Sequence, residues 1–171
     1  GYPNEEKQYQ EYTSAVETMF GLPVNIRTID IGSDKTVSGT ETDSTGTSPL
    51  GLRAIRWSLS EPEIFLTQLR AILRASAHGQ VRLLLPMLAH AQEIYESLRF
   101  IEKAKQQLQE RGKAFNPNIQ IGAMIEIPAA ALMMPLFIKH FDFLSIGTND
   151  VIQYTLAMDR ADQAVAHLYD P

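Results

Sequence analysis

The stretch IQIGAMIEIPAAA, residues 119–131, contains the pattern that decides the fold. The continuous apolar run over 119–127 predicts a buried strand, and the proline and alanines that follow predict a helix beginning at Pro128. One carboxylate, Glu126, lies near the end of this strand. A buried strand that runs directly into a helix is the repeating unit of parallel sheets covered by helices.

The same unit recurs on both sides of this stretch. FDFLSIG, 141–147, is a second predicted strand, and NDVIQYTLAMD after it is typical of a helix. VRLLLPM, 81–87, and VNIRTIDIG, 24–32, are two more predicted strands. The remaining predicted elements are helices over 4–20, 61–79, 90–112 and 128–140 (kinked at Pro135), a Thr-, Ser- and Gly-rich loop over 36–49, and a short strand within 50–59.

A doubly wound sheet and a (β/α)8 TIM barrel both satisfy this order of elements. No G-x-G-x-x-G opens a helix, so a dinucleotide-binding fold has no support. A complete barrel usually needs about 250 residues, and the pattern provides only about five of its eight strands. We therefore expect residues 1–171 to be a single α/β domain, an incomplete TIM barrel.

Composition excludes several classes of protein. Among 171 residues, 44% are hydrophobic and 20% charged, as in soluble globular proteins. The net charge of −5 argues against a general nucleic-acid or anionic-membrane binder. No apolar stretch approaches the ~20 residues of a membrane span, and the polar start is no signal peptide. Cysteine is absent, which excludes disulfides and thiolate metal sites and fits a cytoplasmic location.

Polar side chains gather where the predicted strands end. Glu126 ends one strand, and Thr148, Asn149 and Asp150 follow the next strand along the chain. Neighbouring parallel strands lie ~4.8 Å apart, so Glu126 and Asp150 are expected to share one cation. Oxygen ligands favour Mg²⁺ or Mn²⁺ over zinc. The alternatives are that Asn149 and Asp150 only cap the next helix, and that Glu126 only complements a helix dipole.

Arginines supply the opposite charge. Arg27 interrupts an otherwise apolar strand, where a buried cation needs an anion. Arg53 and Arg56 lie three residues apart in LGLRAIR, and Arg160 is the last residue of LAMDR. Guanidinium groups bind carboxylate and phosphate through paired hydrogen bonds. Together with a divalent cation, they suit a substrate that carries both groups. The alternatives are an ion pair of Arg27 with Asp30 or Asp34, and surface positions for Arg53 and Arg56. The four histidines, 78, 90, 140 and 167, are interpreted as structural.

Five segments, in order, resemble a known family: IRTIDIGSDK, SPLGLRAIR, QLRAILRAS, IGAMIEIPAAA and FDFLSIGTNDVIQYTLAMDR. They look like the phosphoenolpyruvate-binding barrel of the phosphoenolpyruvate–protein phosphotransferases, Enzyme I of the bacterial phosphotransferase system. The resemblance covers essentially the whole chain. The segments PEIFLTQLRAILRAS, LLLPM, HLYD and YPNEEKQY resemble the nitrogen-branch paralogue more than the sugar-branch enzyme.

The resemblance implies a role for each matching residue. Glu126 and Asp150 would hold Mg²⁺, while Asn149, Arg27 and Arg160 would bind phosphoenolpyruvate. Arg53 and Lys35 would line the same pocket. Asp150 would belong to both the metal ligands and the substrate-binding residues. The implied reaction transfers the phosphoryl group to a histidine of a separate N-terminal domain, then to a histidine-containing phosphocarrier protein, and releases pyruvate. Family barrels pair as homodimers, so the same is expected here.

The sequence departs from the family in ways that matter. It contains neither the G-G-x-x-S-H context of the acceptor histidine nor the cysteine that protonates the enolate, so the segment alone is expected to be inactive. The first strand and the last strands are expected outside residues 1–171. Two rival functions stay open: a Mg²⁺-dependent carbon–carbon lyase acting through an enolate, and a non-catalytic dimerisation or regulatory barrel.

The spacing of Asp150 and Arg160 predicts a break in the last helix. A continuous helix would separate residues ten apart by ~15 Å along its axis. For both side chains to reach one ligand, the helix must end near Ala157 and the chain must fold back.

Overall fold

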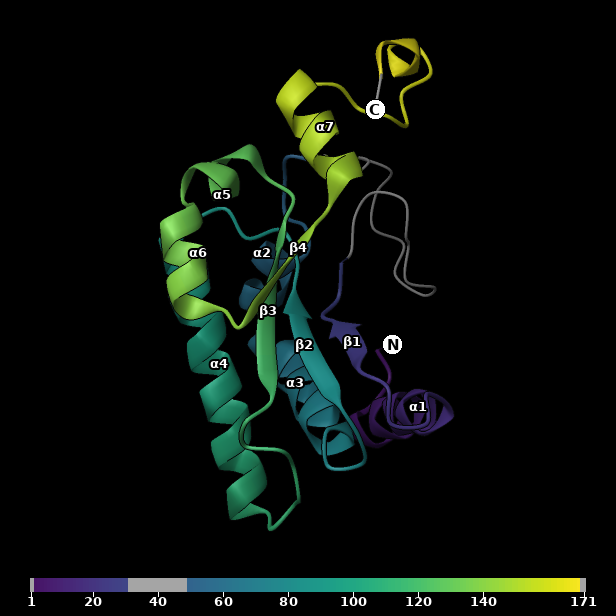
Figure 1. Ribbon diagram of the computed structural model, residues 1–171, viewed down its shortest axis with the longest axis vertical. Coiled ribbons are helices and arrows are strands. Elements are labelled where there is room, and N and C mark those ends of the chain that lie inside the picture. The colour runs from purple at the N-terminus through teal and green to yellow at the C-terminus, as the bar shows by residue number, and fades with distance from the viewer. Residues whose placement is uncertain (1, 31–48, 170–171) are drawn as a thin grey trace.

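The computed structural model describes residues 2–30 and 49–169, which alternate between helices and parallel strands (Figure 1). The elements are α1 Glu5–Thr18, β1 Val24–Arg27, α2 Ile55–Ser60, α3 Pro62–Ala75, β2 Val81–Leu85, α4 Ala91–Glu110, β3 Gln120–Ile125, α5 Pro128–Leu132, α6 Met134–His140, β4 Phe143–Ile146, α7 Thr148–Leu156 and the 3-10 turn η1 Ala166–Leu168. The four predicted strands at 24–32, 81–87, 119–127 and 141–147 are confirmed as β1 to β4. Residues 36–48 of the predicted loop, and Lys35, lie outside the described residues.

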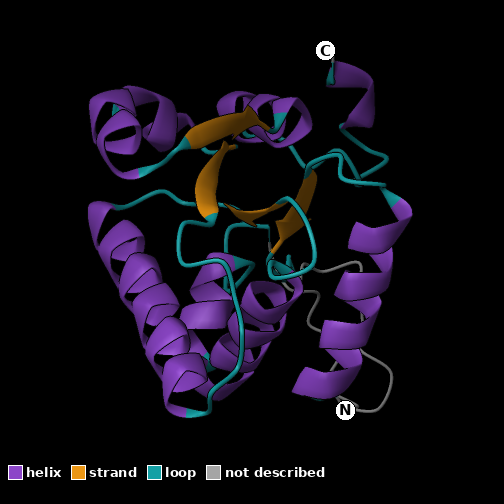
Figure 2. Ribbon diagram, turned by 60° about the horizontal axis from the view of Figure 1, so that its bottom comes forward, coloured by secondary structure: helices purple, strands orange, loops and turns teal. Residues whose placement is uncertain are grey.

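The strands form one parallel sheet in the order β1-β2-β3-β4, so each pairs with its neighbour in sequence. Viewed along the strands, the sheet follows an arc with the helices on its outer side (Figure 2). Parallel strands joined in sequential order by helices are consecutive units of a (β/α)8 barrel. The expected incomplete barrel is therefore confirmed, and all four strands end at the same edge.

The core lies between the arc and the outer helices. The strand residues Ile26, Leu83, Leu85, Ala123 and Ile125 are buried on this side. They pack against apolar stripes of α3 and α4 at helical spacing, formed by Leu66, Leu69, Ile72, Leu73, Ile94, Ile101 and Leu108. Within the described residues, no helix combines the length and the apolar character that a bilayer crossing requires.

The strand predicted within residues 50–59 is wrong, because these residues turn into α2. Leu50 and Leu52, which a strand of the sheet would bury, are exposed. What is buried instead is Ile55 with Ser58, a three-residue spacing that fits a helix packed on α3 and α4. The described residues thus contain four strands, one fewer than expected.

The helix predicted over 128–140 is interrupted, as its internal proline suggests. α5 ends at Leu132 and α6 begins at Met134, with Pro135 in the first turn of α6. A proline has no N–H to donate, and its ring clashes with the carbonyl four residues earlier, so one helix cannot continue through it. Pro135 is tolerated in the first turn of a new helix, α6. The interruption falls two residues before the proline.

Candidate functional site

The predicted site residues meet at the edge where the strands end. Arg27 is the last residue of β1, Glu126 directly follows β3, and Asp150 lies in the first turn of α7 after β4. Glu126 is only 1% exposed and Asp150 8%. Because the strands are parallel and adjacent, their carboxyl ends bring these groups together from segments distant in sequence.

Two aspartates connect three arginines into one network. Asp30 contacts Arg27 Nη1 through Oδ2 at 3.6 Å and accepts a hydrogen bond from Arg53 Nε through Oδ1 at 3.1 Å. Asp150 Oδ1 lies 3.5 Å from Arg53 Nη1 and 3.5 Å from Arg160 Nη1. The arginine side chains thus converge from β1, from the segment before α2 and from beyond α7.

Arg27 differs from expectation in its burial. Its side chain is 44% exposed, because the guanidinium extends past the end of β1. The pairing with Asp30, foreseen as one alternative, does occur; Asp34 lies outside the described residues. Arg27 therefore remains accessible to a ligand while a carboxylate holds it.

The predicted break in the last helix is confirmed. α7 ends at Leu156, and Ala157 adopts a left-handed conformation with φ of 54°. Two bonds from Gln153 hold the returning chain: its carbonyl accepts from the N–H of Met158 at 3.0 Å, and its side-chain Oε1 accepts from the N–H of Arg160 at 3.0 Å. The buried Gln153 amide therefore directs Arg160 back to Asp150.

Glu126 occupies a tight buried position. Its Oε2 accepts a hydrogen bond from the backbone N–H of Met87 at 2.8 Å, and Met87 itself has a φ of 58°. The pKa of Glu126 is raised to about 7, chiefly by burial and also by the charges of Asp150 and Asp30, whereas the Met87 bond and Arg27 oppose the rise. A Cβ added at Gly147 would come 2.5 Å from Glu126 Cγ, so this close approach requires glycine.

The donor set fits a hard cation that completes its shell elsewhere. Among the described residues, no group of three or more His, Asp and Glu side chains is arranged to hold a metal. Mg²⁺ commonly takes one or two protein carboxylates, and substrate oxygens and water supply the rest. Glu126 and Asp150 provide such a pair of carboxylates.

Asn149 and Arg56 have contacts that define their roles. Asn149 Oδ1 accepts a hydrogen bond from the Tyr169 hydroxyl at 2.8 Å, which leaves the amide NH₂ as a donor at the start of α7. Arg56 Nη1 instead donates to the carbonyls of Leu50 and Gly51, and its Nε lies 3.6 Å from Glu93. Arg56 thus stabilises the segment that carries Arg53.

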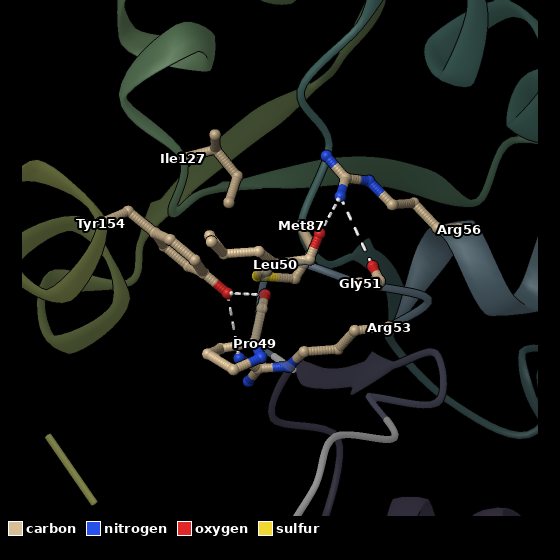
Figure 3. Close-up of a pocket in the computed structure, with 8 residues that line it drawn as sticks. All are labelled: Pro49, Leu50, Gly51, Arg53, Arg56, Met87, Ile127 and Tyr154. Atoms are coloured by element: carbon tan, nitrogen blue, oxygen red, sulfur yellow. Dashed lines mark hydrogen bonds between the residues drawn. The ribbon is translucent and has the colours of Figure 1, made fainter. Parts of the chain in front are cut away.

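A cavity of about 150 Å³ opens beside the network (Figure 3). It is lined by Pro49, Leu50, Gly51, Arg53, Arg56, Met87, Ile127 and Tyr154. Two lining residues connect this cavity to the carboxylates. The Met87 N–H donates to Glu126, and Arg53 pairs with Asp150.

Sequence reasoning missed four contributors: Asp30 as a bridge between arginines, the backbone N–H of Met87, Gln153 and Tyr154. A signal existed only for Asp30, which lies three residues after Arg27. The backbone N–H of Met87 is independent of residue type, and residues 153 and 154 look like ordinary positions of an amphipathic helix.

Comparison with known proteins supplies the family. Residues 1–171 match the family described as PEP-utilising enzyme, PEP-binding domain. The chain belongs to this family. A phosphoenolpyruvate-protein phosphotransferase of Cupriavidus necator is 66% identical over 99% of the chain, and one of Enterococcus faecalis is 46% identical over 99%. The chain spans 29% and 30% of the length of these two relatives.

Among solved structures, a citrate lyase from Burkholderia xenovorans aligns with this chain at 16% identity and a TM-score of 0.43. The alignment includes 96% of this chain and 51% of the citrate lyase chain. So low a score supports no conclusion. The family assignment rests on the sequence matches, which agree with the segments that carried the resemblance.

Proposed function

We propose that this chain is the phosphoenolpyruvate- and Mg²⁺-binding part of a phosphoenolpyruvate–protein phosphotransferase. The observation that carries the proposal is the convergence of Arg27, Arg53 and Arg160 on two aspartates beside the buried Glu126. The family and the names of its relatives favour phosphotransfer over the rival lyase chemistry.

The arginines suit an anion with both carboxylate and phosphate groups. Each guanidinium presents donors in a plane that matches two oxygens of such a group. Asp30 and Asp150 pair with these donors and keep them oriented. The NH₂ of Asn149 provides a further donor on the phosphate side.

Glu126 and Asp150 would hold the Mg²⁺ ion. When bound, the ion supplies positive charge that stabilises the phosphoryl oxygens and the enolate oxygen. The residues of the chain keep Glu126 in place: Met87 fixes one carboxylate oxygen, and Gly147 leaves room for the side chain.

In the reaction, the bond between phosphorus and the bridging oxygen of phosphoenolpyruvate breaks. The phosphoryl group moves to an imidazole nitrogen, the electron pair remains on the enolate, and a proton added at the methylene carbon gives pyruvate. Arg27, Arg53 and Arg160 would bind the charge that shifts during transfer. In the described part of the chain, no hydrogen bond or ion pair joins any of the four histidines to these arginines or to Asp30, Glu126 or Asp150. Because the sequence also lacks the G-G-x-x-S-H context of the family's acceptor, we assign the acceptor histidine to another domain, which passes the group to a phosphocarrier protein.

Three finer expectations remain predictions: the nitrogen-branch subfamily, the homodimer formed through the barrel, and the cytoplasmic location. The first would be tested by asking which phosphocarrier protein accepts the phosphoryl group fastest. The second would be tested by sedimentation of the protein at its full natural length.

Label transfer tests the proposed function. With ³²P-labelled phosphoenolpyruvate and Mg²⁺, the protein at its full natural length is expected to become labelled and to release pyruvate, whereas residues 1–171 alone should not. Arg53→Gln should slow labelling by about a hundredfold, the order of a lost charge-stabilising donor. Arg99→Gln, on the exposed face of α4, is the matched control. A full-length protein that never becomes labelled would contradict the proposal.

A further inference from the structure

Tyr154 lines one side of the cavity shown in Figure 3, and its hydroxyl points toward Pro49. It follows Asp150 by four residues on α7, so the two side chains lie on the same helix face. Its ring lines this cavity and also a neighbouring one of about 310 Å³, and Pro49 and Leu50 line both. Tyr154 therefore lies next to the segment from Pro49 to Arg53 on one side and to the arginine network on the other.

The Tyr154 hydroxyl makes two contacts with opposite roles. It donates its proton to the carbonyl oxygen of Pro49 at 2.6 Å. A phenol has one proton, so the 3.3 Å contact with Arg53 Nη1 uses the phenol oxygen as acceptor. Burial raises the pKa of Tyr154, which keeps the hydroxyl protonated and able to donate at neutral pH. One oxygen atom thus connects both ends of the segment from Pro49 to Arg53.

These contacts fix the plane of the Arg53 guanidinium. Nε donates to Asp30 at 3.1 Å, and Nη1 lies between the Tyr154 hydroxyl and Asp150. No described residue accepts a hydrogen bond from Nη2, the remaining nitrogen. Arg53 is only 15% exposed, so its orientation determines where the Nη2 donors point.

We propose that Tyr154 is a positioning residue that holds Arg53 ready for the phosphoenolpyruvate anion. Its hydroxyl fixes the guanidinium to α7 and ties the backbone at Pro49 to the same point. The inference rests on the proposed function, because the anion is the substrate assigned there. It adds a residue that acts on the substrate only through Arg53.

A double-mutant cycle tests this inference. Phosphoenolpyruvate is titrated calorimetrically into the full-length protein with Mg²⁺, using wild type, Tyr154→Phe, Arg53→Gln and the double variant. Tyr154→Phe should raise Kd about fivefold to tenfold, the usual effect of one lost intramolecular hydrogen bond. In the Arg53→Gln background the same change should have no further effect, since coupled residues are not additive.

Tyr9→Phe is the matched control, because its hydroxyl is hydrogen-bonded to His78 Nε2 at 2.7 Å, at the end of the sheet where β2 begins and opposite the site. This variant should lower the melting temperature as Tyr154→Phe does, but leave Kd unchanged. If Tyr154→Phe changes only the melting temperature, or raises Kd equally with and without Arg53, the inference is wrong while the proposed function stands. If wild type does not bind phosphoenolpyruvate at all, both fall.

Discussion

Glu126 shows how burial and neighbouring charge set the chemistry of one side chain. It is enclosed at the end of β3, where desolvation and the charges of Asp150 and Asp30 raise its pKa to about 7. Without a metal the folded protein therefore holds a proton that the unfolded chain loses near pH 4.5. Stability from this group is fully present below that pH and is lost as pH rises through about 7.

Glu126→Gln should remove this pH dependence. At pH 8 in EDTA the variant should be more stable than wild type by at most about 3 kcal/mol, and near pH 4 the two should be alike. Gln keeps an oxygen that can accept from the N–H of Met87. Urea unfolding at both pH values measures the difference; a difference that does not change with pH would show that Glu126 titrates normally.

Gly147→Ala should displace Glu126 without straining the backbone. The φ at Gly147 is −89°, which alanine adopts readily, but the new Cβ would lie 2.5 Å from Glu126 Cγ. We expect a stability loss of about 1–3 kcal/mol, as for overpacked sites, together with weaker Mg²⁺-dependent ligand binding.

The control for this change is Gly112→Ala, where φ is 62° and no atom lies within 4 Å of the added Cβ. It should cost about 1 kcal/mol through backbone strain and leave ligand binding unchanged. If both alanine variants bind the ligand equally well, the contact between Gly147 and Glu126 has no role in the site.

At the scale of elements, the end of α7 determines whether Arg160 belongs to the site. The sequence predicted this break from the distance between Asp150 and Arg160, but not the residue that secures it. Gln153→Leu should remove the acceptor for the Arg160 N–H while keeping a buried side chain of similar size. Phosphoenolpyruvate should then bind about fivefold to tenfold more weakly.

Fluorescence or calorimetric titration measures this loss, and Arg160→Gln gives the comparison. In the Arg160→Gln background, Gln153→Leu should have little further effect. Additive losses would mean that Gln153 acts through the fold of α7 rather than through Arg160.

The elements also show what a single sequence could and could not predict. Strands β2 and β3 were predictable because their apolar runs are continuous and bounded by helices. Residues 50–59 were not, because the helix there is short and the sequence does not show that Leu50 and Leu52 are exposed while Ile55 is buried. Tyr154 was missed for a related reason: its hydroxyl partners, Pro49 and Arg53, are about a hundred residues away in sequence.

At the scale of the whole molecule, buried ion pairs attach α1 to the barrel. Arg70 Nε lies 2.7 Å from Glu5, and Arg74 pairs with both Glu5 and Glu6. The Arg70 side chain is 8% exposed and also donates to Gln107 at 2.7 Å, so its loss would remove a buried donor from both Glu5 and Gln107. The apolar pattern of α1 predicted a helix but gave no sign of this attachment.

Arg70→Met should lower the free energy of unfolding by about 3 kcal/mol, because two hydrogen bonds of a buried cation are lost, although Glu5 keeps its pair with Arg74. Arg111→Met is the control: Arg111 also contacts Glu5, at 3.3 Å, but is half exposed, and its loss should cost under about 1 kcal/mol. Chemical denaturation measures both variants. Equal losses would show that burial does not determine the strength of these pairs.

The central claim is that Glu126 and Asp150, from neighbouring strand ends, hold one divalent ion beside the arginines. Titration of Mn²⁺, followed by the electron paramagnetic resonance signal of the free ion, tests it most directly in the full-length protein with phosphoenolpyruvate present. We predict one bound Mn²⁺ per chain in wild type, displaced by Mg²⁺, and its loss in both Glu126→Ala and Asp150→Ala. Unchanged Mn²⁺ binding in both variants would contradict the account.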